Sequence, residues 1–231
     1  PEGVDFFVRN LSKHYNGVPP AIKNMGTISF SGEISGYFNE LVTYGKVKTN
    51  VGSVQTDVKL ISNREKGLFA YSGDIKTNNF KLGKMLSNNK LGDVTLNLKV
   101  NGNHYINQYP SIIMKGLISS IDYSSYTYEN ITLDGAYKQG GFTGKAALDD
   151  TNGSILVNGN INTVSKIPTF KFNASINHFR PYNLHLTPRY QDAEFSVNIR
   201  ADFTGGSIDE MNGEINIDSL LFITPEKRQF M

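Results

Sequence analysis

Apolar and polar residues alternate with a period of two along most of this chain. In Val94–Gly102, four apolar residues share one face, while Thr95 and Lys99 lie on the opposite face with two asparagines. The same alternation recurs in Phe170–Ile176 and Phe195–Phe203. Because successive side chains of a strand point to opposite faces, each segment predicts a β-strand with one apolar and one polar face.

Similar segments succeed one another nearly from end to end, separated by turns rich in Gly, Asn and Asp. We predict strands at residues 4–15, 26–36, 42–50, 52–62, 67–77, 93–102, 112–122, 125–138, 141–149, 153–163, 169–177, 192–204 and 207–218. Several connections are short enough for tight hairpins, so neighbouring strands should pair antiparallel as a meander. The fold class is therefore all-β, in one segment covering residues 1–231, with no linker that indicates a domain break.

An aromatic-x-Gly motif recurs in the predicted strands. It occurs at Phe30–Gly32, Tyr71–Gly73, Phe142–Gly144 and Phe203–Gly205. A glycine inside a strand usually marks a bend or a close approach of another backbone. One glycine per strand at a similar depth would curl a wide sheet steadily, whereas glycines that merely sit near strand ends would not.

Three short segments depart from the strand pattern. Phe80–Leu86 has apolar residues at helical spacing, and we expect it to cap the apolar face as a short helix through Phe80, Leu82, Met85 and Leu86. Pro181 could open a second short helix, and Pro19-Pro20 a third that contains Ala21–Asn24.

Composition excludes several classes of function. The chain has 23 basic and 21 acidic residues, a balance that gives no reason to expect nucleic acid. It has no cysteine, which excludes disulfides and thiol chemistry, and no apolar run approaches the roughly 20 residues of a membrane-spanning helix. The chain begins at Pro1, so we interpret it as a piece of a longer protein whose targeting signal or membrane anchor lies outside it.

No residue constellation for catalysis or metal binding is present in the sequence. Only His178 and His185 are close among the four histidines, and their spacing does not match common zinc motifs. Residues 149–153 lack the alternating ligands of a calcium loop, and no nucleophile elbow or phosphate-binding glycine loop occurs. We therefore predict that the chain is not an enzyme and that it has no cofactor and no metal.

Three blocks of sequence resemble the AsmA-like family, and in particular its TamB-type translocation and assembly module subunits. Phe80–Leu86 reads F-x-L-G-x-M-L, and the segment after it, Leu91–Gly102, reads L-G-x-x-x-L-x-x-x-V-x-G. Tyr126–Ile161 and Ala201–Ile215 carry further Gly-rich strand motifs of the same kind. Together the blocks cover roughly residues 70–220.

The resemblance implies an elongated, curled β-sheet, open along one side, with an apolar inner face. It also implies a protein of the Gram-negative periplasm that is anchored in the inner membrane. Such proteins are linked to phospholipid transport toward the outer membrane and to the assembly and secretion of outer-membrane proteins with a barrel partner.

Three functions remain open at this stage. The chain could be a hydrophobic groove for phospholipid acyl chains, a module that pairs its free edges with nascent outer-membrane strands, or a closed β-sandwich for adhesion or glycan binding. The first requires an inner face that can hold acyl chains. The residues that we expect to line it are Ile28, Phe30, Val94, Leu96, Leu98, Val100, Phe170, Phe172, Ile176, Phe195, Val197 and Ile199.

Overall fold

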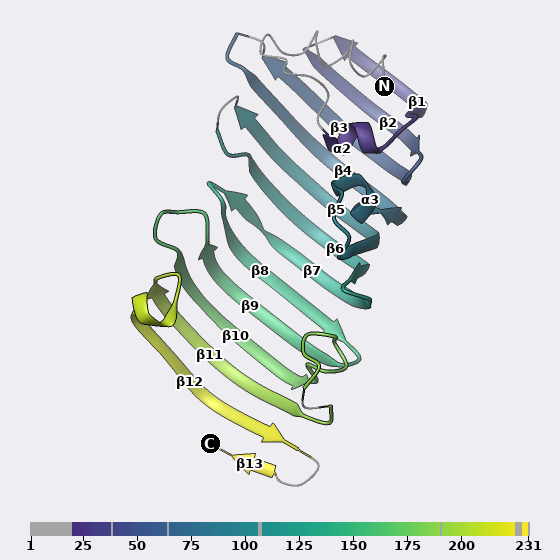
Figure 1. Ribbon diagram of the computed structural model, residues 1–231. Helices are drawn as coiled ribbons and strands as arrows, with labels where there is room; N and C mark the ends of the chain where they lie inside the picture. Colours follow the sequence, from purple (N-terminus) through teal and green to yellow (C-terminus); the bar gives the residue numbers. More distant parts are fainter. Residues whose placement is uncertain are drawn as a thin grey trace.

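The chain forms one elongated antiparallel sheet (Figure 1). The structure, a computed structural model, describes residues 20–37, 39–63, 65–105, 108–189, 191–224 and 228–230. Within these ranges thirteen strands lie side by side in chain order, so each strand pairs only with its neighbours in the sequence. The sheet is curled but not closed, and its inner face is apolar. A closed sandwich of two sheets is thereby excluded for this part of the chain.

The strands are ten residues or longer in most cases. They are β1 (Ser29–Tyr37), β2 (Glu40–Thr49), β3 (Gly52–Asn63), β4 (Leu68–Lys81), β5 (Leu91–Tyr105), β6 (Ser111–Tyr123), β7 (Tyr126–Lys138), β8 (Gly141–Asp150), β9 (Gly153–Asn162), β10 (Thr169–Phe179), β11 (Glu194–Thr204), β12 (Asn212–Ile223) and β13 (Arg228–Phe230). Two short α-helices, α2 (Pro20–Asn24) and α3 (Leu82–Leu86), and a 3-10 turn, η1 (Ile208–Glu210), complete the described elements.

Most predicted strands lie close to the observed ones, and the differences fall outside the regular alternation. Residues 207–211 are not strand, because η1 turns the chain before β12 begins at Asn212. Pro181 does not open a helix. The chain there closes a single turn, with the Leu184 amide donating to the Arg180 carbonyl at 3.1 Å. The predicted strand at 4–15 lies outside the described residues, and β13 was not predicted.

The two long sides of the sheet, where the strands end, differ in the segments that connect the strands. On one side the connections include α3 and the loop 180–193, and α2 precedes β1 there, so we call it the covered side. On the other side the connections are hairpins and short loops, at 37–40, 63–68, 105–111, 138–141, 162–169 and 204–212, and we call it the open side. In Figure 1 the covered side lies to the right and the open side to the left.

The covered side contains the main hydrophobic cluster. Val51, Phe80 and Val94 are buried there, and Met25, Leu82, Met85 and their neighbours on β3, β5 and β6 pack against them. The Asn24 side-chain amide ties α2 to α3 by donating to the Met85 carbonyl at 2.9 Å and to the Ser87 hydroxyl at 2.8 Å. Burial of these apolar side chains supplies the free energy that two five-residue helices could not supply alone.

The loop 180–193 packs on the same side of the sheet, farther along. Leu184 in this loop is 0 % exposed, and the Tyr128 hydroxyl on β7 donates to its carbonyl at 2.8 Å. Glu194, at the base of the loop, accepts from Arg180 Nε at 2.9 Å and pairs with His178 Nδ1 at 2.7 Å. The hydrogen bond with His178, reinforced by Arg180, holds the pKa of Glu194 below its ordinary value despite partial burial.

The aromatic-x-Gly motif has a structural explanation in two of its copies. Gly32 pairs with Gly45, and a Cβ on Gly45 would lie 3.0 Å from Cζ of Phe30. Gly144 pairs with Gly135 in the same relation, and a Cβ on Gly135 would lie 2.6 Å from Cζ of Phe142. In both copies the aromatic ring lies over the neighbouring strand's glycine, so the motif packs a large side chain closely against bare backbone.

Candidate functional site: the apolar inner face

Four rows of inward-facing residues cross the sheet at right angles to its strands. The register pairs place one residue of each strand from β1 to β12 in every row. The row nearest the covered side is Phe30, Val47, Val54, Thr77, Leu96, Ile118, Ile131, Leu148, Ile155, Ile176, Val197 and Leu220. Twelve strands at about 4.8 Å spacing make this continuous apolar surface roughly 50 Å long.

The two central rows, which we call the floor, contain many small residues. Glycine or alanine occupies many of their positions, namely 32, 45, 73, 116, 135, 144, 146, 159, 174 and 201. The row nearest the open side is larger again, with Leu41, Leu60, Tyr71, Ile112, Tyr137, Phe142, Ile161, Phe170 and Phe203. Small residues between two large rows give the inner face the cross-section of a trough.

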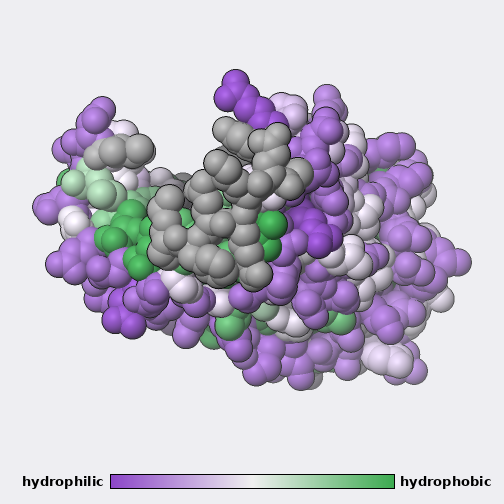
Figure 2. Space-filling view, turned by 90° about the horizontal axis from the view of Figure 1, so that it is seen from below, coloured by the Kyte–Doolittle hydropathy of each residue, from purple (hydrophilic) through white to green (hydrophobic). Residues whose placement is uncertain are grey.

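Figure 2 views the molecule along the sheet from the β12 end. Hydrophobic side chains gather there inside a hollow, while most of the surrounding surface is hydrophilic. At both ends of the sheet the inner face is open to solvent, because Ile34 on β1 and Ile217 on β12 are each more than half exposed. The apolar rows therefore run the full width of the described sheet and reach both of its edges.

The predicted lining residues fall on this face. Phe30, Leu96, Ile176 and Val197 belong to the row nearest the covered side, and the floor contains four more. Those four are Leu98, Val100, Phe172 and Ile199. Phe170 lies in the row nearest the open side, and Ile28 precedes β1 and is half-buried. Val94 and Phe195 lie beyond the rows, under the covered side.

Not all of these residues offer surface to a ligand. Val94 is enclosed in the cluster with Phe80, and Leu98, Val100 and Val197 are also buried, because curling crowds the inner side chains together. The remaining predicted residues are half-buried and retain accessible apolar surface. Accessible apolar surface therefore lies in both large rows, whereas several floor residues, Leu98 and Val100 among them, are buried.

The capping segment Phe80–Leu86 is partly as predicted. Phe80 is only 4 % exposed, and Leu82 and Met85 pack against its cluster. Phe80 belongs to β4 and not to the helix, which begins at Leu82. The prediction was wrong for Leu86, which is 48 % exposed, because a helix of five residues turns only one face to the sheet.

Sequence reasoning named lining residues at only four of the twelve strands, β1, β5, β10 and β11. Ile118, Ile131, Leu148 and Ile155 on β6 to β9 continue the row that contains Leu96, and Tyr71 and Phe142 stand in the open-side row. Their alternation was visible in the sequence. To place these residues in shared rows, the register between neighbouring strands is needed as well. That register follows if each connection is assumed to be a tight hairpin.

The outer face of the sheet is mostly polar and carries ion pairs between register partners. Lys115 Nζ lies 2.7 Å from Asp134 Oδ2, and Lys171 Nζ lies 2.7 Å from Asp202 Oδ2. Pairing with these aspartates raises the pKa of both lysines. Opposite charges facing each other across strands support the register that also aligns the apolar rows.

The described residues contain no group of three or more His, Asp or Glu side chains arranged to hold a metal ion. Among the same residues, no helix has the length and apolar character needed to cross a membrane. Comparison of the chain with protein-family models, with curated proteins and with solved structures finds no match. The family resemblance therefore rests on the sequence blocks at 80–102, 126–161 and 201–215.

Proposed function

We propose that this chain is a segment of a hydrophobic groove that carries or shields phospholipid acyl chains between the two membranes of a Gram-negative envelope. One observation carries the proposal: four apolar rows run across twelve strands on the same face of an open sheet. Among the described residues, α2, α3 and the loop 180–193 cover only one long side of that face. An apolar surface of this length needs an apolar occupant.

The chemistry of the face suits an alkyl chain. Each methylene that moves from water onto the face contributes roughly 0.8 kcal/mol. Leu133 and Ile131 are typical of the lining, which offers no charged side chain among its described inward residues. A lining that is apolar and similar from strand to strand lets a chain slide without a deep local trap.

The shape of the trough sets the orientation in which an acyl chain would lie. Large side chains such as Phe142 and Phe170 stand on the open side of the floor, and Ile131 and Ile155 on its covered side. Between them Gly135, Gly144 and Gly159 pair in register, and the Phe142 ring lies over Gly135. An extended acyl chain fits lengthwise along this floor, across the strands, so transport would follow the long axis of the sheet.

The cellular setting comes from the resemblance to AsmA-like proteins. In this proposal the chain lies in the periplasm, the inner-membrane anchor lies elsewhere in the protein, and an outer-membrane barrel of the assembly-module type is the partner at the far end. The groove would thereby supply phospholipid to the outer membrane and support the assembly and secretion of its proteins.

A second candidate function is the pairing of a free sheet edge with a nascent outer-membrane strand. No described strand pairs with the outer edge of β1, and β13 pairs with only the last three residues of β12. Ser29–Tyr37 and Asn212–Leu220 therefore each leave one edge without a described partner, and an extended chain could add to such an edge.

The first test of the groove is whether phospholipid copurifies with the chain. The chain is purified from a bacterial host without detergent and extracted, and the extract is analysed by mass spectrometry. The groove predicts bound phospholipid at a defined ratio to protein. A lipid-free protein that also fails to take up a fluorescent phospholipid from vesicles contradicts the groove and leaves edge pairing as the better candidate.

The second test blocks the floor. Ala146 lies on the floor in β8, and Ala147 is its neighbour on the outer face of the same strand. Ala146→Phe should weaken uptake of the fluorescent phospholipid about tenfold, a loss of about 1.4 kcal/mol, while Ala147→Phe leaves uptake unchanged. Equal uptake by the two folded variants would show that acyl chains do not follow the floor.

A further inference from the structure

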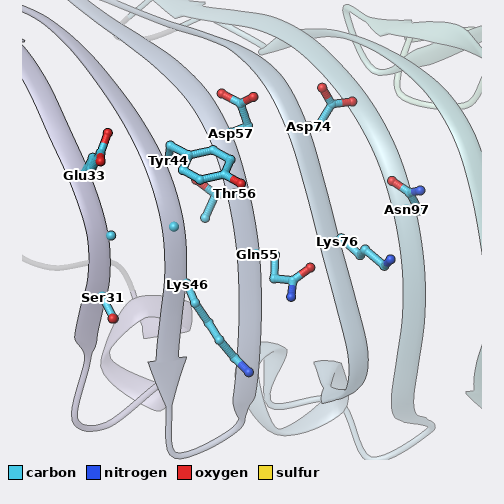
Figure 3. A pocket seen from close by; sticks show the side chains of 12 residues that line it. Ser31, Glu33, Tyr44, Lys46, Gln55, Thr56, Asp57, Asp74, Lys76 and Asn97 are labelled. Carbon is cyan, nitrogen blue, oxygen red and sulfur yellow. The ribbon is translucent and has the colours of Figure 1, made fainter.

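The outer face has a depression of about 540 Å³ over β1 to β5, on the side of the sheet opposite the groove (Figure 3). Tyr44 on β2 stands in its middle and is 66 % exposed. Its register partners are Glu33 on β1 and Asp57 on β3, so a large ring lies between two carboxylates. An exposed aromatic ring surrounded by polar side chains on an otherwise polar face is a feature that the groove does not explain.

The polar side chains around Tyr44 are sorted by charge into two parallel rows. The row that contains Tyr44 continues with Asp74 on β4 and is acidic. The neighbouring row runs through Lys46, Gln55, Lys76 and Asn97, and it offers ammonium and amide donors. A ligand lying across these strands therefore meets acceptors along one edge and donors along the other.

Most of these groups have no partner within the described protein. Among the described residues, no hydrogen bond or ion pair is made by the side chains of Glu33, Lys46, Asp57 and Lys76. Asp74 makes only one ion pair, in which its Oδ2 lies 3.9 Å from Lys99 Nζ. The depression thus combines oriented, unpaired hydrogen-bonding groups with an exposed ring.

A second depression on the same face provides an internal comparison. It has a volume of about 670 Å³ and lies over β8 to β11. There Lys171 pairs with Asp202 at 2.7 Å, and the Asn160 amide donates to the Thr143 hydroxyl at 2.5 Å. No tyrosine lines it. Its lysine and aspartate therefore satisfy each other, unlike the lysines and carboxylates around Tyr44, although Arg200 and two asparagines there have no partner among the described residues.

We propose that the depression around Tyr44 binds an uncharged oligosaccharide. A hydroxyl group both donates and accepts, so a polyhydroxylated ligand can donate to Asp57 and Asp74 while it accepts from Lys46 and Lys76. A ligand of one charge sign would be repelled by one of the two rows. The site lies on the face opposite the groove, and the proposal does not depend on lipid binding.

Tyr44 supplies the apolar part of the recognition. The C–H face of a sugar ring is apolar and packs on an aromatic ring, and the exposed Tyr44 ring is free to accept it. The Tyr44 hydroxyl has no described partner, so the ring and not the hydroxyl should dominate its contribution. Gln55 and Asn97 stand within reach of the hydroxyls at the rim of such a ring.

The test starts from an array of neutral, sulfated, uronic-acid and amino oligosaccharides probed with the purified chain. The proposal expects binding to neutral oligosaccharides. The tightest neutral ligand is then titrated by calorimetry against the unmodified chain and against Tyr44→Ala, Tyr44→Phe and Asp57→Asn. Tyr44→Ala should weaken binding about tenfold, because the stacking surface is lost. Asp57→Asn should weaken binding by a smaller factor, and Tyr44→Phe should change it less than twofold.

A matched control is Tyr37→Ala. Tyr37 is the last residue of β1, is more exposed than Tyr44 and lies outside the depression, so its removal should leave binding unchanged. The proposal is overturned if the array shows no neutral ligand or only charged ones. It is also overturned if folded Tyr44→Ala binds as well as the unmodified chain, or if Tyr37→Ala loses as much affinity as Tyr44→Ala.

Discussion

The covered side and the open side of the sheet have the same strand pattern but differ in burial. Phe80 and Leu184 on the covered side are almost completely inaccessible. Phe170 and Phe203 on the open side, whose stacked ring centroids lie 4.7 Å apart, are only half-buried. The strands do not cause this difference, because every strand runs from one side to the other. Two short helices and one loop cause it, and among the described residues nothing comparable covers the other long side, where a ligand could enter.

The largest effect should come from a matched pair of phenylalanines. Phe80→Ala leaves a cavity in the cluster under α3 and should lower the free energy of unfolding by about 3–5 kcal/mol. Phe170→Ala removes a half-buried ring and should cost less than half as much. Urea unfolding followed by circular dichroism measures both variants. Equal losses would mean that the open side is packed as a core and is not available to a ligand.

Leu184 and Leu186 lie in the same loop, 180–193, but differ in burial, so their alanine variants test the effect of burial alone. Leu184→Ala should cost about 2–4 kcal/mol, since its side chain has no exposed surface. Leu186→Ala should change stability by less than about 0.5 kcal/mol, because Leu186 is 53 % exposed. Hydrogen exchange of the loop amides is the second readout. Unchanged protection in Leu184→Ala would show that this leucine does not hold the loop on the sheet.

A methyl group added to a glycine should be tolerated differently on the two sides of the sheet. A Cβ on Gly83 in α3 would clash with the Leu91 carbonyl group, so Gly83→Ala must displace α3 and should cost about 1–3 kcal/mol. Gly206, in the open-side loop, has its nearest neighbouring atom 3.8 Å from the added Cβ. Gly206→Ala should be neutral or slightly stabilising. Thermal unfolding midpoints of the two variants test this contrast.

The smallest effect concerns pH and the base of the loop 180–193. Because the folded-state pKa of Glu194 is lowered, its pairing with His178 and Arg180 contributes stability above the ordinary pKa of a glutamate. That contribution is lost as the pH falls through the lowered value. Glu194→Gln should therefore cost about 1 kcal/mol at neutral pH and flatten the acid limb of the stability curve. An acid limb that is unchanged in Glu194→Gln would exclude this pairing as its cause.

Sequence alone anticipated the strands and the two short helices, but not the covering loop 180–193 or the depth of burial. Alternation in Val94–Val100 identifies both the strand and its inner face, because a side-chain period of two has one structural meaning. Alternation does not say how buried Leu98 becomes, since burial depends on the curl of the whole sheet. The role of Leu184 was hidden for a different reason: it lies in an irregular loop whose hydrogen bonds have no periodic signal.

The depression around Tyr44 could not be predicted from the sequence either. Tyr44 follows the alternation as an outward residue, and its exposure is not unusual for a tyrosine. Its significance comes from Glu33 and Asp57 on adjacent strands, and from the lack of ion pairs that other parts of the same face have. Such a site depends on register across five strands, which a single strand does not encode.

The strict neighbour-to-neighbour pairing of β1 to β12 makes this fold nearly one-dimensional. Each hairpin brings together residues that are close in the sequence, so little chain entropy is lost in closing it, and folding can propagate strand by strand from any local nucleus. For the same reason the length of the trough can change without a change in its cross-section. Adding or removing one hairpin lengthens or shortens the trough by about 10 Å. Such a molecule can be matched in evolution to the distance it must span without redesign of its lining.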